Sequence, residues 1–251
     1  MFRSLSIRVL APHRRSRRIL IQPAHSGLQE MPFAAFARLG SDGADQPTPL
    51  VQFWRDVDRF VEQELRSRDF HCDIDPQGSG FVLSVLFSSS VTRAPPKPRL
   101  ACISCDIGNP IAQACLIHET AWHRCWIDAK ARCYYIVTPI AHVETLRDLS
   151  DIQLSTLWTD ALDLLDLEVP RALGVSSPGS QLFDRLTINF GCYRNLAHLH
   201  LKVKVSSSLF ARIVAHWDPS RQARRQESLR LATNPHNMAA FIGGSFRPPP
   251  F

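Results

Sequence analysis

The sequence predicts an α+β fold, because it contains segments with strand periodicity as well as segments with the periodicity of amphipathic helices. Apolar residues recur at helical spacing over about 49–67, where charged residues fill much of the other face. A second helix is predicted over about 151–168, with Ser150 capping its first turn. Short apolar runs with turn residues around them predict strands at 81–87, 133–138, 186–190 and 198–205.

The composition is that of a globular chain whose positive charge is confined to one end. Hydrophobic residues make up 45% of the chain and charged residues 21%, so a packed core is expected. No apolar run approaches the roughly 18–20 residues of a membrane span, so none is predicted. Six arginines precede the first acidic residue, Glu30; the other 23 Lys and Arg (29 less these six) equal the 23 Asp and Glu. A nucleic-acid partner is therefore not indicated.

Residues 1–30 carry those six arginines and several serines, with no acidic residue before Glu30. This composition is typical of a mitochondrial transit peptide, and the alternative is a basic tail that binds acidic surfaces. The first interpretation predicts a mitochondrial protein and the second a cytoplasmic one. The chain has seven cysteines, an odd number at low density, which favours a reducing compartment over a fold held by disulfides.

The chain is expected to divide into four parts. Residues 1–30 form the transit peptide or basic tail, and 49–99 form a helix–strand extension that ends in a proline-rich connection. Residues 100–206 form the central domain, and 207–251 form a C-terminal helical extension with a disordered tail.

The segment 197–205 carries the side chains of greatest chemical interest. It reads Ala-His-Leu-His-Leu-Lys-Val-Lys-Val, an alternation that places His198, His200, Lys202 and Lys204 on one face of a strand. A neutral imidazole can act as a nucleophile, a base or a metal ligand, and the nearby ammonium groups favour a bound phosphate. Taken alone, a strand with a solvated polar face explains the pattern more simply.

Three further motifs stand before this segment. Residues 102–107 read Cys-Ile-Ser-Cys-Asp-Ile, residues 139–142 read Pro-Ile-Ala-His, and residues 189–191 read Asn-Phe-Gly. In this order and together with 198–202, they resemble the histidine-triad (HIT) superfamily, whose members carry His-x-His-x-His near the end of the domain. The resemblance implies that residues 100–206 form a HIT-like domain, an antiparallel sheet packed with helices.

The resemblance also implies roles for individual residues. His200 would attack the α-phosphate of a nucleotide to form a nucleotidyl-histidine intermediate, with His198 supporting it. Asn189 and Gly191 would lie near the ribose and phosphate, although Asn189 could equally serve as a turn residue beside Gly191. The implied activity is that of a nucleotide phosphoramidase, hydrolase or nucleotidyl transferase acting on a nucleotide or nucleotide conjugate. Relatives often form dimers, so a homodimer is also implied, although no residue of this chain indicates one.

Two departures from the family pattern bear on these roles. Lys202 stands where the third histidine is found, and a lysine can neutralise phosphate but cannot relay a proton as an imidazole does. The alternative function is therefore a catalytically impaired nucleotide-binding or assembly subunit with a structural zinc site. The stretch 126–133 is also shorter than the family's proline-containing loop, which leaves the base preference open.

A structural zinc site is the second feature that the resemblance implies. Several HIT proteins pair the Cys-x-x-Cys motif with the Pro-x-x-His histidine and the first triad histidine around zinc. The matching residues here are Cys102, Cys105, His142 and His198. Tetrahedral zinc takes four Cys or His ligands, and a Cys-x-x-Cys turn supplies two of them. The alternative is that the two cysteines are buried as small apolar residues and His142 lies in a loop.

Overall fold

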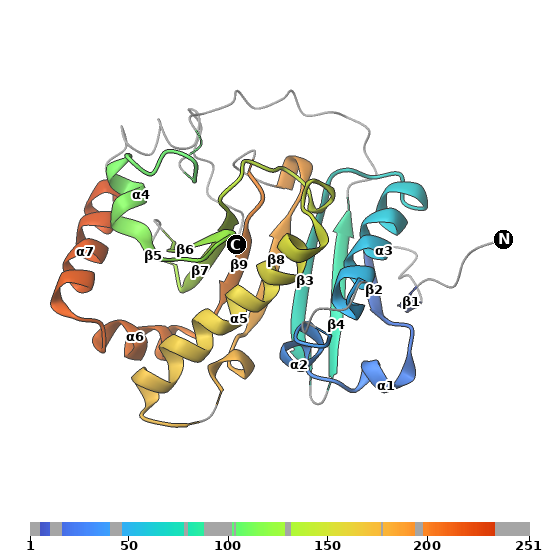
Figure 1. Cartoon of the computed structure of the whole chain (residues 1–251), viewed down its shortest axis with the longest axis horizontal. Coiled ribbons are helices and arrows are strands. Elements are labelled where there is room, and N and C mark those ends of the chain that lie inside the picture. The colour runs from blue at the N-terminus through green and yellow to red at the C-terminus, as the bar shows by residue number, and fades with distance from the viewer. Residues whose placement is uncertain are drawn as a thin grey trace.

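A nine-stranded antiparallel sheet organises the part of the chain that the structure describes. The structure is a computed structural model, which describes residues 6–10, 17–40, 47–77, 80–87, 102, 104–128, 132–176, 178–193 and 198–233. The strand order is β1-β2-β4-β3-β8-β9-β7-β6-β5, and every neighbouring pair is antiparallel. The prediction of an α+β fold with an antiparallel sheet is confirmed (Figure 1).

The strands and helices have the following bounds. The strands are β1 Ile7–Leu10, β2 Arg18–Pro23, β3 Phe70–Gln77, β4 Gly80–Phe87, β5 Leu116–Glu119, β6 His123–Ile127, β7 Tyr134–Pro139, β8 Arg185–Asn189 and β9 Leu201–Lys204. The α-helices are α1 Ser26–Gln29, α2 Phe33–Ala37, α3 Pro49–Gln63, α4 Pro110–Cys115, α5 Asp151–Leu173, α6 Ser207–Ala215 and α7 Pro219–Thr233. Single 3-10 turns cover Leu146–Asp148, Gly179–Gln181 and Gly191–Tyr193.

The core lies between the sheet and the helices α2, α3 and α5, which lie on the same side of it (Figure 1). Trp54 of α3 stacks on Trp158 of α5 with ring centroids 4.5 Å apart, and both rings are buried. Phe33 of α2 packs edge-on against Trp158 and against Phe81 of β4. Because large aromatic rings bury most apolar surface per residue, this cluster fixes the helices on the sheet.

The segment predicted as an extension, 49–99, contributes β3 and β4 to the middle of the sheet. β3 pairs with β8, so it joins this segment to the strands of 100–206. The sequence patterns predicted β4 but not β3. Helix α3 begins where it was predicted and ends at Gln63, four residues earlier than expected. It stops there because the chain turns at Arg66, which has a positive φ of 49°, into the start of β3.

Helix α5 is longer than predicted, so the expected end near residue 168 is wrong. It continues through Pro170 to Leu173 and is closed by Gly174, whose φ of 65° lies in the left-handed region. The proline lacks an N–H, which weakens a helix interior. The last turns nevertheless remain helical because Val169 and Ala172 are buried in the core.

The strand predicted over 198–205 is shorter in the structure, because β9 begins only at Leu201. The buried side of the alternation is confirmed, since Leu199, Leu201, Val203 and Val205 are fully buried. His198 does not share the polar face with the lysines, which corrects the prediction. Its side chain is also buried, because it turns toward Cys102 and Cys105 rather than standing on the sheet.

Two parts of the N-terminal segment 1–30 are strands of the sheet. β1 pairs with β2, and β2 pairs with β4, which places Ile19 and Ile21 in the core. The backbone N–H and the hydroxyl of Ser6 both donate to Asp56 of α3 at 2.8 Å. The transit peptide and mitochondrial location stay predictions, but removal of 1–30 would take away two strands.

We expect deletion of residues 1–30 to destabilise the protein. Loss of the apolar surface that Ile19 and Ile21 bury would alone cost about 3–6 kcal/mol. Loss of β2 would also leave β4 as an unpaired edge of the sheet. Urea unfolding of the full chain and of residues 31–251 measures the difference. Equal midpoints would contradict an integral role for β1 and β2. Fusion of residues 1–30 to a fluorescent reporter tests targeting separately, and a diffuse cytosolic signal would contradict the transit peptide.

The C-terminal helices predicted after residue 207 are present as α6 and α7, and the tail predicted to be disordered lies outside the described residues. Arg221 of α7 is not a solvated arginine, since it pairs with the buried Glu168 of α5 at 2.9 Å. Among the described residues, no helix is long and apolar enough to cross a membrane.

Candidate functional site

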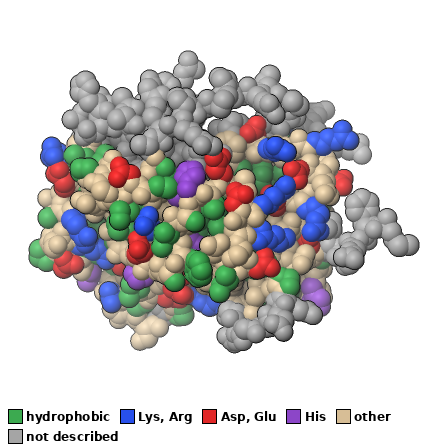
Figure 2. Space-filling model, turned by 45° about the horizontal axis from the view of Figure 1, so that its top comes forward, with side chains coloured by type: hydrophobic (Ala, Val, Ile, Leu, Met, Phe, Trp, Pro, Cys, Tyr) green, Lys and Arg blue, Asp and Glu red, His purple; other side chains and the backbone are tan. Residues whose placement is uncertain are grey.

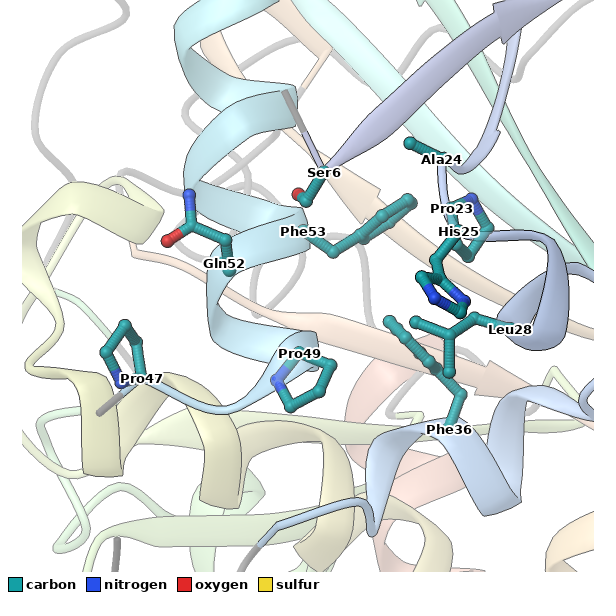
Figure 3. Close-up of a pocket in the computed structure, with 10 residues that line it drawn as sticks. All are labelled: Ser6, Pro23, Ala24, His25, Leu28, Phe36, Pro47, Pro49, Gln52 and Phe53. Atoms are coloured by element: carbon teal, nitrogen blue, oxygen red, sulfur yellow. The ribbon is translucent and has the colours of Figure 1, made fainter. Parts of the chain in front are cut away.

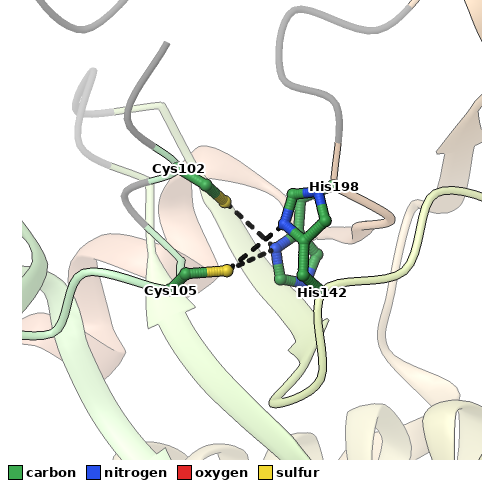
Figure 4. A group of neighbouring side chains, drawn as sticks. All are labelled: Cys102, Cys105, His142 and His198. Carbon is green, nitrogen blue, oxygen red and sulfur yellow. Dashed lines mark hydrogen bonds between the residues drawn. The ribbon is translucent and has the colours of Figure 1, made fainter. Parts of the chain in front are cut away.

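Four side chains from three separate segments meet at one end of the sheet. Cys102 and Cys105 precede α4, His142 follows β7, and His198 precedes β9 (Figure 4). The Sγ of Cys102 lies 3.1 Å from Nδ1 of His198, and the Sγ of Cys105 lies 3.3 Å from Nδ1 of His142 and 3.5 Å from that of His198. All four donor atoms lie within 4.8 Å of one another, so this Cys2His2 cluster could hold a metal ion.

Hydrogen bonds to main-chain carbonyls hold these segments together. The amides of Cys105 and Asp106 both donate to the carbonyl of Cys102 at 2.9 Å, which closes the tight turn between the two thiols. The guanidinium of Arg124 on β6 donates to the carbonyl of Ser104 at 2.9 Å. The amide of Leu199 donates to the carbonyl of Val143 at 2.7 Å, which ties the segment of His198 to that of His142.

The chemistry of the cluster fits a tetrahedral metal centre. Nε2 of His198 donates to the carbonyl of Pro139 at 2.9 Å, so the neutral ring directs the lone pair of Nδ1 at the two thiols. Burial, with smaller effects of His142 and Arg124, lowers the pKa of His198 to about 4, which keeps this ring neutral at neutral pH. Zinc bound to sulfur at ~2.3 Å and nitrogen at ~2.0 Å needs donor separations of ~3.3–3.8 Å. The three sulfur–nitrogen distances of 3.1, 3.3 and 3.5 Å lie within or just below this range.

The thiol of Cys105 would have to lose its proton on binding a metal. Partial desolvation and the neighbouring Cys102 raise the pKa of Cys105 to about 11. Metal binding would therefore release protons, and its affinity would fall as the pH is lowered.

His200 lies two residues beyond His198, and its ring is fixed by that neighbour. Its Nδ1 donates to the main-chain carbonyl of His198 at 2.9 Å. In a neutral ring this leaves the lone pair on Nε2, the tautomer that a nucleophile or a base requires. The side chain is half-buried. His198 therefore contributes its side chain to the Cys2His2 cluster and orients the ring of His200 through its main-chain carbonyl.

Asn189 and Lys202 lie beside His200 on the polar side of the sheet. In the pairing of β8 with β9, Thr187 lies opposite Lys202 and Ile188 opposite Leu201. Continued by one further residue on each strand, this register would set Asn189 opposite His200. Of the predicted site residues, the structure therefore brings Asn189, His200 and Lys202 into one neighbourhood. His198 lies next to it in the Cys2His2 cluster.

Gly191 was predicted near the nucleotide, and the structure gives it a clear backbone role. Its φ is 57°, in the left-handed region, and an added Cβ would lie 1.8 Å from Oδ1 of Asp69. Only glycine fits this position. The turn that it allows ends β8 directly after Asn189.

The sequence patterns missed a polar network on the same side of the sheet. His71 of β3 pairs with Asn189 in the strand register, and Nδ1 of His71 lies 2.5 Å from Oδ1 of Asn189. Nε2 of His71 lies 2.8 Å from Asp73, which accepts from the hydroxyl of Thr187 at 2.6 Å. The alternation His-Cys-Asp-Ile-Asp over 71–75 was the available signal, since it is typical of a strand with one polar face.

A separate cavity of about 580 Å³ lies between the N-terminal strands and helices α2 and α3 (Figure 3). Phe36, Phe53 and Leu28 supply apolar walls, and Ser6, His25 and Gln52 supply polar groups. None of the predicted site residues lines it. Its walls at Ser6 and Pro47 border segments outside the described residues.

The charges on the described surface are mixed. Figure 2 shows acidic side chains interspersed among the lysines and arginines of the face in view. This agrees with the balance of charges that follows Glu30 in the sequence. The surface in view therefore offers no broad single-sign patch of the kind that generic polyanion binding requires.

Comparison with known proteins identifies the fold. No protein-family profile matches the sequence, and no curated protein matches it. Among solved structures, a uridylyltransferase matches over 92% of this chain and 87% of its own, with a TM-score of 0.51 and 11% sequence identity. The chain has the HIT-like fold.

Two further structures match over a large part of the chain. A GalT-like protein from Arabidopsis thaliana has a TM-score of 0.49 at 13% identity and covers 80% of this chain and 74% of its own. An ADP-glucose phosphorylase from Arabidopsis thaliana with bound ADP-glucose has a TM-score of 0.48 at 11% identity, over 80% of this chain and 72% of that one. The fold rests on the uridylyltransferase match, which at 11% identity concerns the fold alone, and function depends on the site residues.

Proposed function

We propose that this chain is a divergent HIT superfamily enzyme, a nucleotide phosphoramidase, hydrolase or nucleotidyl transferase that works through a nucleotidyl-histidine intermediate on His200. The observation that carries the proposal is the hydrogen bond from Nδ1 of His200 to the carbonyl of His198. It favours the tautomer whose Nε2 lone pair can attack phosphorus.

The proposed reaction has two displacements. Nε2 of His200 attacks the α-phosphorus, an N–P bond forms, and the leaving group departs with the electron pair of its bond to phosphorus. The ring becomes cationic, and the carbonyl of His198 stabilises it by accepting from Nδ1. Water or another acceptor then attacks phosphorus and displaces His200 as a neutral imidazole. The proton that the acceptor gives up passes to solvent, and the departed leaving group takes up a proton from solvent.

Asn189 and Lys202 are the proposed phosphate-binding groups. An amide can donate to a phosphate oxygen, and an ammonium group neutralises its charge. Asn189 ends β8, the strand that pairs with β9, and Lys202 lies on β9 two residues beyond His200. The proposed partner is thus a nucleotide or nucleotide conjugate, and a homodimer remains an additional proposal from the resemblance.

We also propose zinc as the metal of the Cys102–Cys105–His142–His198 cluster. Two thiolates and two imidazoles are the donor set that tetrahedral structural zinc prefers. When bound, the ion would crosslink the three segments. Its proposed role is to hold His198, and through the carbonyl of His198 to hold the ring of His200.

The second candidate is a nucleotide-binding or assembly subunit with impaired catalysis and the same zinc site. Lys202 favours it, because an ammonium group binds phosphate without replacing the imidazole of a proton relay. The long segments outside 100–206 also favour a role beyond turnover.

Intact-protein mass after incubation with an adenosine phosphoramidate separates the two candidates. We expect an adenylyl adduct or product from the wild type, and a loss of at least about a thousandfold in rate in His200→Ala. His216→Ala is the matched control, since that histidine is exposed at the end of α6. Binding without adduct or product would favour the subunit, and absence of binding would contradict both candidates.

A further inference from the structure

His71 forms the direct lateral contact of Asn189 on the polar side of the sheet. The two residues lie opposite each other in the pairing of β3 with β8, strands that run side by side in Figure 1. His71 lies on the β3 side of Asn189, and His200 follows on the β9 side. Asn189 therefore lies between a histidine that holds its amide and the histidine proposed to react.

Both ring nitrogens of His71 face oxygen acceptors. Nδ1 meets Oδ1 of Asn189 at 2.5 Å, and Nε2 meets Oδ2 of Asp73 at 2.8 Å. A neutral imidazole has one N–H, so two such bonds require the imidazolium ion. Asp73 is buried and is held as an acceptor by the hydroxyl of Thr187 at 2.6 Å.

The charge state of His71 decides which end of the Asn189 amide faces it. The imidazolium donates to Oδ1 of Asn189, and the amide NH2 is then turned away from β3. A neutral ring that still donates to Asp73 has an acceptor at Nδ1, and it would be satisfied by the NH2 of Asn189 instead. When His71 loses one proton, the Asn189 amide would turn, and its Oδ1 acceptor would replace its NH2 donor on the side of His200.

We propose that His71 is a positioning residue that holds the Asn189 amide with its NH2 presented to the phosphate bound at His200. This role rests on the proposed function. Asn189 would touch the substrate, whereas His71 acts through Asn189 alone.

The electrostatic surroundings of His71 support this role. Burial alone would lower the pKa of His71, but the hydrogen bonds with Asp73 and Asn189 and the charge of Asp73 raise it above 6.5. Lys202 on β9 opposes that rise. Burial would likewise raise the pKa of Asp73, and the bonds from His71 and Thr187 with the charges of His71 and Arg185 lower it instead. The ring of Tyr193 also lies near, at 6.2 Å between centroids.

The direction of the pH dependence follows from these shifts. Because the pKa of His71 is raised in the folded protein, the imidazolium and its bond to Asn189 are present at low pH. They are lost as the pH rises through the raised pKa. Phosphate affinity that depends on the Asn189 donor should therefore fall on the alkaline side, by about tenfold for one charge-assisted hydrogen bond.

The test is calorimetric titration with diadenosine diphosphate from about pH 6 to about pH 9. Its phosphates have no second ionisation in this range, so a change in affinity reports on the protein. We expect the wild type to weaken about tenfold across one transition, and His71→Gln, whose amide donates without titrating, to lose that transition. His216→Gln should keep the wild-type profile.

A double-variant comparison tests whether His71 acts through Asn189. In an Asn189→Ala background, His71→Gln should have no further effect on affinity or its pH profile. Nitrogen chemical shifts of His71 should show both ring nitrogens protonated below the transition in the wild type, and the pKa should be lower in Asn189→Ala. Thermal unfolding of each variant shows whether it is folded.

Each result either supports the positioning role or overturns it. A folded wild type that binds, together with a His71→Gln variant that keeps the wild-type profile, overturns the positioning role and leaves the proposed function standing. A His71→Gln effect that persists in Asn189→Ala also overturns it. Absence of binding by folded wild type at every pH overturns the proposed function, and the positioning role with it.

Discussion

Replacing Cys102 with serine is expected to abolish metal binding and to destabilise the region around His198. Elemental analysis of the wild type should give about one zinc per chain, and Cys102→Ser should give none. A ligand that binds only the folded state stabilises it by about 4 kcal/mol when its free concentration is a thousand times the Kd. Loss of zinc should lower the free energy of unfolding by a similar amount. Elemental analysis and urea unfolding measure the two effects.

The loss of zinc should also slow adduct formation at His200. The ring of His200 is held by the carbonyl of His198, whose own side chain would lose its ligand partner. Cys133→Ser is the matched control, because Cys133 is a half-buried thiol outside the cluster and should leave the metal content unchanged. A metal-free wild type, or a Cys102→Ser variant with a full complement of zinc, would contradict the zinc proposal.

Replacing Glu168 with alanine is expected to cost about 3–5 kcal/mol, because it breaks a buried ion pair from one side. Glu168 accepts from the indole N–H of Trp217 at 2.7 Å and from Arg221 at 2.9 Å. The guanidinium of Arg221 also lies over the Trp217 ring, 4.3 Å from its centroid. Without the carboxylate, the half-buried guanidinium of Arg221 would lose its anionic partner, and its Nε already has no partner among the described residues.

Urea unfolding, followed by tryptophan fluorescence, measures this cost. Glu227→Gln is the matched control, since Glu227 pairs with Arg230 on the exposed side of the same helix α7 and should leave the midpoint unchanged. Equal midpoints for Glu168→Ala and Glu227→Gln would show that the buried pair does not anchor α7 to α5. A large loss only in Glu168→Ala is the expected result.

The family resemblance was sufficient to predict the Cys2His2 cluster, and local patterns in the sequence were sufficient for much of the fold. The four predicted ligands Cys102, Cys105, His142 and His198 do meet in space, because each occupies a motif with its own turn or strand end. Helices α3 and α5 and strand β7 follow from hydrophobic periodicity, which burial against a single core imposes on the sequence.

Long-range pairing was beyond the reach of these patterns. β2 joins the sheet through β4, and β3 through β8, both far away in the chain, whereas β1 pairs with the nearby β2. The arginines near β1 and β2 concealed two strands with a buried face. The extension of α5 past Pro170 was missed for a similar reason, since the burial that keeps its last turns helical comes from tertiary packing.

The sequence by itself determined which residues are candidates for the site, and the tertiary structure decided how they are oriented. Alternation predicted one polar face for His198 and His200, whereas the fold turns His198 into the cysteine cluster and uses its carbonyl to orient His200. His71 and Asn189 are 118 positions apart in the chain, and their contact depends on the register of β3 with β8. Side-chain periodicity specifies the face of each strand, but only the packing of the whole sheet specifies its neighbours.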